Sequence, residues 1–174
     1  MSFHCSRRRL LSFAAGAAVV GLARPSLATE LARPRGKPVL RVGGKISVRN
    51  VDDEAVFDIA LLDAIGSRTF KTATPWTDGV STWEGVPLSA LMDAVGATGT
   101  IIRATALNDY VADMPMAGLA EDGAILALRR DGVLMPISNK GPLFILYPFD
   151  DRPALQQQSF YMRCAWQIAR LDVL

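Results

Sequence analysis

The side chains that most often carry out chemistry in proteins, histidine and cysteine, are almost absent from this chain. Its 174 residues include one histidine, His4, and two cysteines, Cys5 and Cys164. His4 and Cys5 lie in an N-terminal segment that is typical of a cleaved export signal. After cleavage, no histidine is left for a catalytic triad or a metal site, and one cysteine can form neither an internal disulfide nor a thiolate cluster.

Residues 1–28 have the composition of a secretory signal peptide. Arg7-Arg8-Arg9 precedes the apolar run Leu10–Ala23, and Ser26-Leu27-Ala28 provides small residues at the usual cleavage positions. The apolar run is shorter than the roughly 20 residues that a transmembrane helix needs. We therefore expect export with cleavage rather than a membrane anchor.

The stretch Ser6–Leu11 also resembles the twin-arginine export signal, which is an address read by a receptor. The sequence does not decide between this route and the general secretory route, and both lead to the periplasm of a Gram-negative bacterium. Residues 1–28 contain four basic residues and no acidic one, so the remaining chain has 15 Lys and Arg against 17 Asp and Glu. We expect no binding to nucleic acid, because no basic stripe remains.

Residues 38–174 are expected to form one domain, preceded by a flexible polar arm at residues 29–37. Apolar spacing predicts a helix over Val56–Ile65, with Asp58 as its N-cap. A second helix, Pro87–Val95, has the clearest pattern, and its apolar stripe consists of Leu88, Leu91, Met92 and Val95.

Short apolar runs separated by turn residues predict β-structure in most of the remaining chain. Arg68–Thr74 is typical of a strand, and Asp131-Gly132 predicts a hairpin. Gly43-Gly44 would interrupt a strand over Pro38–Ser47, and Phe149–Gln158 predicts an exposed loop. The other expected strands are Thr100–Leu107, Tyr110–Pro115, Ala124–Leu128, Val133–Pro136 and Leu143–Tyr147, and Ser159–Leu174 predicts one helical turn and a last strand. Hairpins packed on a few helices make an α+β domain with mixed β-sheets.

Five stretches occur in the same order as in a known family. They are Trp83–Leu88, Ala106–Tyr110, Leu126–Pro136, Lys140–Pro148 and Trp166-Gln167. Together they resemble the molybdopterin-binding domain of the sulfite oxidase family of oxidoreductases. The resemblance implies a sulfite oxidase-type fold, in which mixed β-sheets and a few short helices surround a pterin pocket.

One position departs from that family. The resemblance implies a molybdenum-ligating cysteine a few residues before Trp76, and Thr72 stands at that position. A threonine hydroxyl is a poor substitute for a soft thiolate. Cys164 lies far away in an apolar segment and is expected to be a small buried hydrophobic residue. We therefore expect a pterin pocket without molybdenum, without a metal site and without catalytic residues.

Short, exported members of this fold that lack the cysteine resemble periplasmic pterin-binding regulators of cyclic di-GMP signalling. That resemblance implies a non-catalytic sensor that binds a reduced or molybdopterin-like pterin and acts on a membrane-bound signalling protein. Two alternatives stay open. One is a molybdenum-cofactor-dependent oxidoreductase with a non-cysteine ligand set, and the other is an interaction module that kept only the fold. The sequence identifies neither the pterin, nor the partner, nor the oligomeric state.

A pterin has a flat face and an edge of hydrogen-bond donors and acceptors, so its site needs an aromatic surface and polar edge groups. Trp76, in a predicted loop Pro75–Asp78, is the first candidate for the stacking face, and a core position is its alternative. Trp83 and Trp166 lie among apolar residues and are expected in the core. The predicted cofactor-binding residues are Thr72, Trp76, Asp78, Asn108, Tyr110, Lys140 and Arg163.

Overall fold

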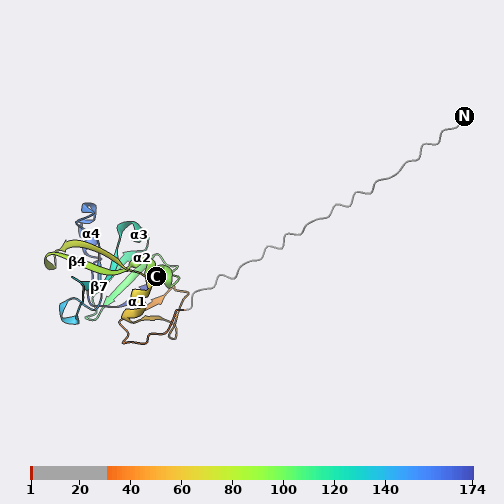
Figure 1. Ribbon diagram of the computed structural model, residues 1–174, viewed down its shortest axis with the longest axis horizontal. Coiled ribbons are helices and arrows are strands. Elements are labelled where there is room, and N and C mark those ends of the chain that lie inside the picture. The colour runs from red at the N-terminus through yellow and green to blue at the C-terminus, as the bar shows by residue number, and fades with distance from the viewer. Residues whose placement is uncertain (2–30) are drawn as a thin grey trace.

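The protein is seen in a computed structural model that describes Met1 and residues 31–174 (Figure 1). The predicted signal peptide lies outside the described residues, as does the start of the predicted arm. The described part of the arm is held against the domain, because the N–H groups of Arg35 and Gly36 donate to Asp58 Oδ2 at 2.9 and 2.7 Å. Within the described residues, no helix combines the length and the apolar character needed to cross a membrane.

The first sheet brings the two ends of the domain side by side. β1 (Leu40–Gly44) pairs in parallel with β10 (Ile168–Val173), which is antiparallel to β5 (Ile101–Ala106). β2 (Ala55–Phe57) and β6 (Val111–Pro115) form the edges, and the strand order is β2-β1-β10-β5-β6. One parallel pair among antiparallel pairs makes this a mixed sheet, as predicted.

The second sheet is antiparallel, in the order β3-β4-β7-β8, and β9 also pairs with β7. Its strands are β3 (Arg68–Thr74), β4 (Thr77–Pro87), β7 (Ile125–Arg130), β8 (Val133–Leu134) and β9 (Phe144–Leu146). β3 has the predicted bounds. The predicted hairpin between β7 and β8 is also confirmed: Asp131 and Gly132 have φ of 52° and 80°, the left-handed backbone that a two-residue hairpin turn requires.

β4 is longer than the sequence indicates. The loop predicted over Pro75–Asp78 is a tight turn at Pro75 and Trp76, and Thr77 and Asp78 already belong to the 11-residue strand. The polar and glycine-containing start of β4 suggests a loop, and Asp78 and Gly79 do bulge out of the pairing, with Gly79 at φ 65°. Thr77 and Val80 on either side pair with Thr74 and Ala73 of β3. Trp83, in the same strand, is fully buried, as predicted.

Two short helices match the sequence patterns closely. α1 (Ile59–Ile65) begins after Asp58, whose side chain accepts from the Leu61 N–H at 2.9 Å, as an N-cap does. Hydrogen bonds from the Gly36 and Leu61 amides hold the pKa of Asp58 below its ordinary value. The helix predicted from Val56 starts later, because the preceding residues pair in β2. α2 (Leu88–Ala94) buries the predicted stripe.

The other helical segments are single turns. They are α3 (Leu119–Asp122), η1 (Ile137–Asn139), η2 (Pro153–Leu155) and α4 (Gln158–Tyr161). The helical turn and final strand predicted near the C-terminus are confirmed by α4 and β10. In Figure 1, α4 lies at the top of the folded domain and α1 lies in its lower half.

Two other sequence predictions need correction. Phe149–Gln158 is not exposed throughout, because Phe149 and Leu155 are only 2% and 5% exposed and anchor the segment to the core. The break predicted at Gly43-Gly44 is confirmed, because β1 ends at Gly44, but the strand predicted over Pro38–Ser47 does not resume after the glycines. Gly44 has φ of 81°, and a Cβ there would meet the Val173 carbonyl oxygen at 2.2 Å.

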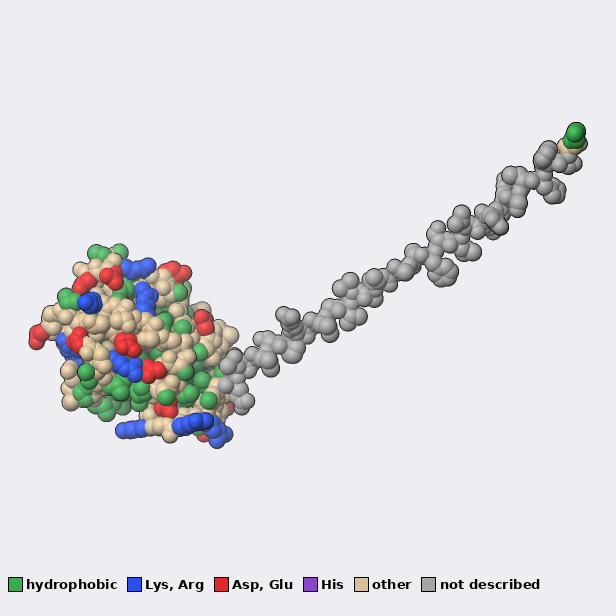
Figure 2. Space-filling view, in the orientation of Figure 1, with side chains coloured by type: hydrophobic (Ala, Val, Ile, Leu, Met, Phe, Trp, Pro, Cys, Tyr) green, Lys and Arg blue, Asp and Glu red, His purple; other side chains and the backbone are tan. Residues whose placement is uncertain are grey.

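One hydrophobic cluster connects both sheets and the helices. On the face seen in Figure 2, acidic and basic side chains are interspersed. Several of them form ion pairs, such as Arg129 with Asp63 at 2.8 Å and Arg103 with Asp113 at 2.7 Å. The α+β architecture with mixed β-sheets is therefore confirmed.

Candidate functional site

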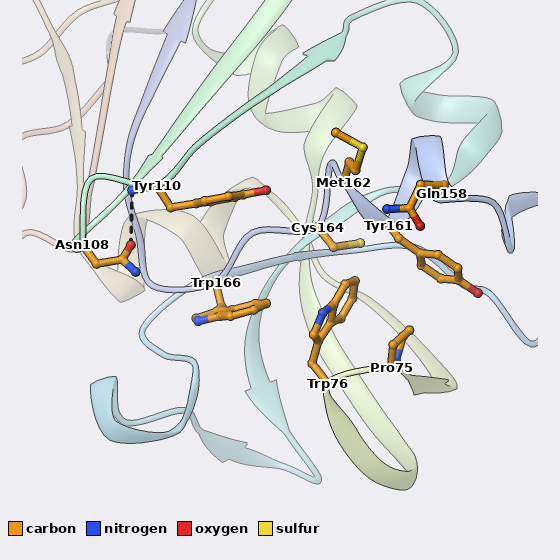
Figure 3. Close-up of a pocket in the computed structure, with 9 residues that line it drawn as sticks. All are labelled: Pro75, Trp76, Asn108, Tyr110, Gln158, Tyr161, Met162, Cys164 and Trp166. Atoms are coloured by element: carbon orange, nitrogen blue, oxygen red, sulfur yellow. Dashed lines mark hydrogen bonds between the residues drawn. The ribbon is translucent and has the colours of Figure 1, made fainter.

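A cavity of about 390 Å³ lies where three segments of the chain meet (Figure 3). The β3–β4 turn and the β5–β6 turn contribute one part of its lining, and α4 with the chain between α4 and β10 contributes the rest. The lining residues are Pro75, Trp76, Asn108, Tyr110, Gln158, Tyr161, Met162, Cys164 and Trp166. The concave shape, the volume and the aromatic lining are those of a small-molecule pocket.

Trp76 lies at the centre of an aromatic wall. Its ring centroid is 5.8 Å from that of Trp166, 6.0 Å from that of Tyr161 and 6.1 Å from that of Phe144. Phe144, in β9, joins this wall to the core because it also packs against Trp83. Tilted and edge-to-face pairs hold such rings in defined orientations. Trp76 therefore lines the pocket and also packs in a cluster. The stacking position and the core position that the sequence left as alternatives are both occupied by the same ring.

In the view of Figure 3, the ring of Tyr110 lies above the ring of Trp166. The Tyr110 N–H donates to Asn108 Oδ1 at 3.3 Å, which orders the β5–β6 turn that carries both residues. Within residues 31–174, Tyr110 makes none of the ring–ring contacts that join the other pocket aromatics, and it is 48% exposed. The ring of Tyr110 therefore lines the pocket but stands apart from the packed aromatic wall.

Among the described residues, no Asp, Glu, Lys or Arg lines the pocket. Its polar side-chain groups are the amides of Asn108 and Gln158, the hydroxyls of the two tyrosines, the indole N–H groups of the two tryptophans and the Cys164 thiol. Cys164 is 3% exposed, and its thiol donates to the Phe160 carbonyl oxygen at 3.5 Å. Burial raises the pKa of Cys164, so the thiol stays neutral at physiological pH. The pocket offers aromatic faces and neutral hydrogen-bonding groups, without a fixed charge.

Of the predicted cofactor-binding residues, the pocket contains Trp76, Asn108 and Tyr110. Asp78 lies in β4, where its backbone oxygen is 3.5 Å from Arg130 Nη2, and it does not line the pocket. The two predicted cations, Lys140 and Arg163, do not line the pocket, and each lies against an aromatic ring. Lys140 Nζ is 4.4 Å from the centroid of Trp166, and the Arg163 guanidinium carbon is 4.5 Å from the centroid of Phe160.

Thr72 lies outside the pocket and forms a buried junction with the chain after β9. Its hydroxyl accepts from the Asp150 N–H and donates to the Ala73 carbonyl oxygen, both at 3.1 Å. The Ala73 N–H donates to Asp150 Oδ2 at 2.9 Å, and Trp83 Nε1 donates to the Thr72 carbonyl oxygen at 3.1 Å. We call this set of Thr72, Ala73, Trp83 and Asp150 the Thr72 junction.

The donor groups present do not fit a molybdenum site. In the part of the chain that the structure describes, no group of three or more His, Cys, Asp or Glu side chains could hold a metal ion. The Thr72 hydroxyl is a hard donor already used in the Thr72 junction, and the Cys164 thiol is kept neutral by burial. The flat ring of a pterin, in contrast, fits the aromatic lining of the pocket.

The sequence analysis missed Gln158, Tyr161 and Met162 and placed Trp166 in the core. Trp166 does pack against Phe144, at 5.8 Å between centroids, but it also lines the pocket. Cys164 is buried, as predicted, and lines the pocket as well. An apolar segment that covers a core and one that lines a cavity have the same composition, so no sequence signal distinguishes them.

Comparison with known proteins identifies the family. Residues 60–149 match the family model described as "Oxidoreductase molybdopterin binding domain". The match covers more than half of the chain, and the chain therefore belongs to this family. Trp76, Asn108 and Tyr110 lie inside the matched region, and the part of the pocket between α4 and β10 lies beyond it.

Solved structures agree with this assignment. The chain is similar to the sulfane dehydrogenase SoxCD from Paracoccus pantotrophus, with a TM-score of 0.56 and 18% sequence identity. The similarity covers 77% of this chain and 37% of the SoxCD chain, so this chain spans little more than a third of that protein's length. Likeness at this identity shows the fold, which is the sulfite oxidase-like molybdopterin-binding fold. No curated protein matches the chain.

Proposed function

We propose that this chain is a periplasmic, non-catalytic sensor that binds a pterin and regulates a membrane-bound signalling protein. The observation that carries the proposal is the aromatic pocket, which Trp76, Tyr110 and Trp166 line together with neutral amides. Membership of a molybdopterin-binding family supports a pterin as that ring.

The pocket supplies both features that a pterin requires. Trp76 and Trp166 provide ring faces, and stacking on such faces is favourable for flat heterocycles. The amides of Asn108 and Gln158 each provide a donor and an acceptor for the pterin edge. Because a buried polar edge without partners costs free energy, these amides would favour a pterin over a purely hydrocarbon ring.

The Thr72 junction supports a role without metal chemistry. The resemblance to the sulfite oxidase family puts the metal-ligating cysteine at Thr72, whose hydroxyl is used in joining β3 to Asp150. Three exposed apolar residues, Leu107, Tyr110 and Met162, lie in the turns beside the pocket and are 52%, 48% and 61% exposed. An apolar rim beside a ligand pocket gives a partner protein a surface on which ligand occupancy can be sensed.

Binding can be tested with the purified chain and tetrahydrobiopterin under anaerobic conditions. We expect saturable quenching of tryptophan fluorescence, since two tryptophans line the pocket. Asn108→Ala should weaken binding, and Asn139→Ala, an exposed asparagine outside this pocket, is the matched control and should not. Absence of saturable binding would rule out the proposed function.

The regulatory part of the proposal needs a separate experiment. Capture of solubilised membrane proteins on the immobilised chain, with and without tetrahydrobiopterin, should yield a partner whose amount depends on the pterin. If the chain does not bind pterin and captures the same amount of a membrane protein with and without tetrahydrobiopterin, it is an interaction module instead. Cell fractionation tests the periplasmic location directly.

A molybdenum-cofactor-dependent oxidoreductase is the second candidate, and one observation favours it: a cysteine, Cys164, does line the pocket. Metal analysis of protein produced in a host that makes the molybdenum cofactor decides between the two. Stoichiometric molybdenum together with reduction of a dye acceptor would identify an oxidoreductase and contradict the sensor proposal. Protein that contains no molybdenum but still binds pterin would support the sensor proposal.

A further inference from the structure

Lys140 contacts a wall of the pocket from the outside. Its Nζ lies 4.4 Å from the centroid of the Trp166 ring, which is within the range of a cation–π interaction. Trp166 lines the pocket and Lys140 does not. The charged group therefore meets a part of the indole that a ligand in the pocket does not occupy.

The position of Lys140 is fixed by backbone contacts on both sides. Its carbonyl oxygen accepts from the Gln167 N–H at 3.2 Å, and Gln167 Nε2 donates to the Ile137 carbonyl oxygen at 2.7 Å. The neighbouring Gly141 N–H donates to the Pro136 carbonyl oxygen at 2.9 Å. These bonds attach η1 and the backbone of Lys140 to the residue that follows Trp166, so the Lys140 side chain starts next to the indole that its ammonium group contacts.

The charge of Lys140 is not neutralised nearby. None of the ion pairs found within residues 31–174 involves Lys140, and no carboxylate lines the pocket. A cation on an aromatic ring attracts its π electrons and makes the remainder of the ring less negative. A less negative ring stacks better on an electron-rich partner, because the repulsion between the two π clouds is smaller.

We infer that Lys140, acting through Trp166, makes the pocket selective for the reduced form of a pterin. Reduction converts two ring nitrogens of the pterin into electron-donating amines, and the remaining pyrimidinone ring becomes electron-rich. The oxidised pterin is electron-poor and gains nothing from the polarised indole. Lys140 is thus a specificity-determining residue that does not contact the ligand, and this inference rests on the proposed pterin binding.

The test compares two ligands that differ only in ring oxidation state, tetrahydrobiopterin and biopterin. Their dissociation constants are measured on the full chain and on Lys140→Met, which keeps an unbranched side chain but has no charge. We expect the wild-type chain to prefer tetrahydrobiopterin, and Lys140→Met to reduce that preference roughly two- to fivefold. The ratio of the two constants is the readout, because a merely structural defect weakens both ligands alike.

Lys140→Arg keeps a cation on the indole and should keep the preference, and Lys71→Met, an exposed lysine of β3, is the matched control. Lys140→Gln serves as a second uncharged variant if Lys140→Met does not fold. An unchanged ratio in the uncharged variants, or a wild-type preference for biopterin, would overturn the inference but leave pterin binding standing. Binding of neither pterin to the wild-type chain would overturn both.

Discussion

Two neighbouring places in the β3–β4 hairpin are built in opposite ways: the Thr72 junction near the end of β3, and Trp76 in the turn that follows. At the Thr72 junction, a fully buried hydroxyl, two backbone N–H groups and an indole N–H all have hydrogen-bond partners. A few residues later, Trp76 presents its ring to an open cavity in which the amides of Asn108 and Gln158 are available. A position whose hydrogen-bonding groups all have partners has little left to offer a ligand, whereas aromatic faces beside side-chain amides with spare hydrogen-bonding capacity can bind one.

Under the proposed function, a fold of the molybdopterin-binding family supports recognition without the metal. The Thr72 junction stabilises the scaffold, and the pocket is a separate part of the molecule. Four predictions test this separation, from the largest expected effect to the smallest.

Trp83→Ala should produce the largest loss of stability. Trp83 is fully buried, packs against Phe144 and donates to the Thr72 carbonyl oxygen, so its removal should lower the free energy of unfolding by about 3–5 kcal/mol. Urea denaturation measures this change. Trp76→Ala, at the half-buried pocket position, should cost clearly less, and equal losses would contradict the distinction between the two regions.

Trp166→Leu should affect binding more than stability. Losing one stacking face should weaken tetrahydrobiopterin binding by about 1–3 kcal/mol, the range measured when an aromatic residue that stacks on a base is removed. Calorimetric titration gives the affinity, and urea denaturation of the same variant shows how much of the packing against Phe144 and Trp76 is lost. Unchanged affinity would place the ligand away from Trp166.

Thr72→Val should show the reverse pattern. The change keeps the shape but removes the acceptor for the Asp150 N–H, so the free energy of unfolding should fall by about 1 kcal/mol while pterin affinity stays the same. Thr72→Ser keeps the hydroxyl and is the control. A large loss of pterin affinity in Thr72→Val would show that the junction and the pocket are one functional unit.

Ionisation of the Cys164 thiol should have the smallest effect on the free energy of unfolding, and that effect is confined to alkaline pH. Burial raises the pKa of Cys164, so above about pH 8.5 the thiol ionises in the unfolded chain but not in the folded one. Its contribution to stability is therefore present at neutral pH and decreases as the pH rises. Cys164→Ala should make the alkaline loss of stability shallower in urea denaturation. Rapid alkylation of the native thiol at neutral pH would instead indicate a reactive thiolate and favour the oxidoreductase.

Several elements follow from local patterns because their determinants lie within a few residues of sequence. The α2 stripe, the Asp58 cap and the Asp131-Gly132 turn are examples, and the structure contains all three. The start of β4 was not predictable in this way, because Thr77 and Val80 belong to the strand through their pairing with β3 across the hairpin rather than through their own propensity. Phe149 and Leu155 were misjudged for the same reason, since their burial depends on what they pack against.

The sequence alone determined that residues 38–174 contain no histidine and no pair of cysteines. It also indicated the α+β class, the family resemblance and three of the pocket residues, Trp76, Asn108 and Tyr110. Only the tertiary structure decided which side chains share the pocket. Trp166 and Tyr161 join Trp76 because β10 and α4 return the end of the chain to the β3–β4 turn, and the same packing puts Lys140 on the outer side of Trp166. Residue type and spacing set what each segment can form, but contacts between segments far apart in sequence set what a pocket can bind.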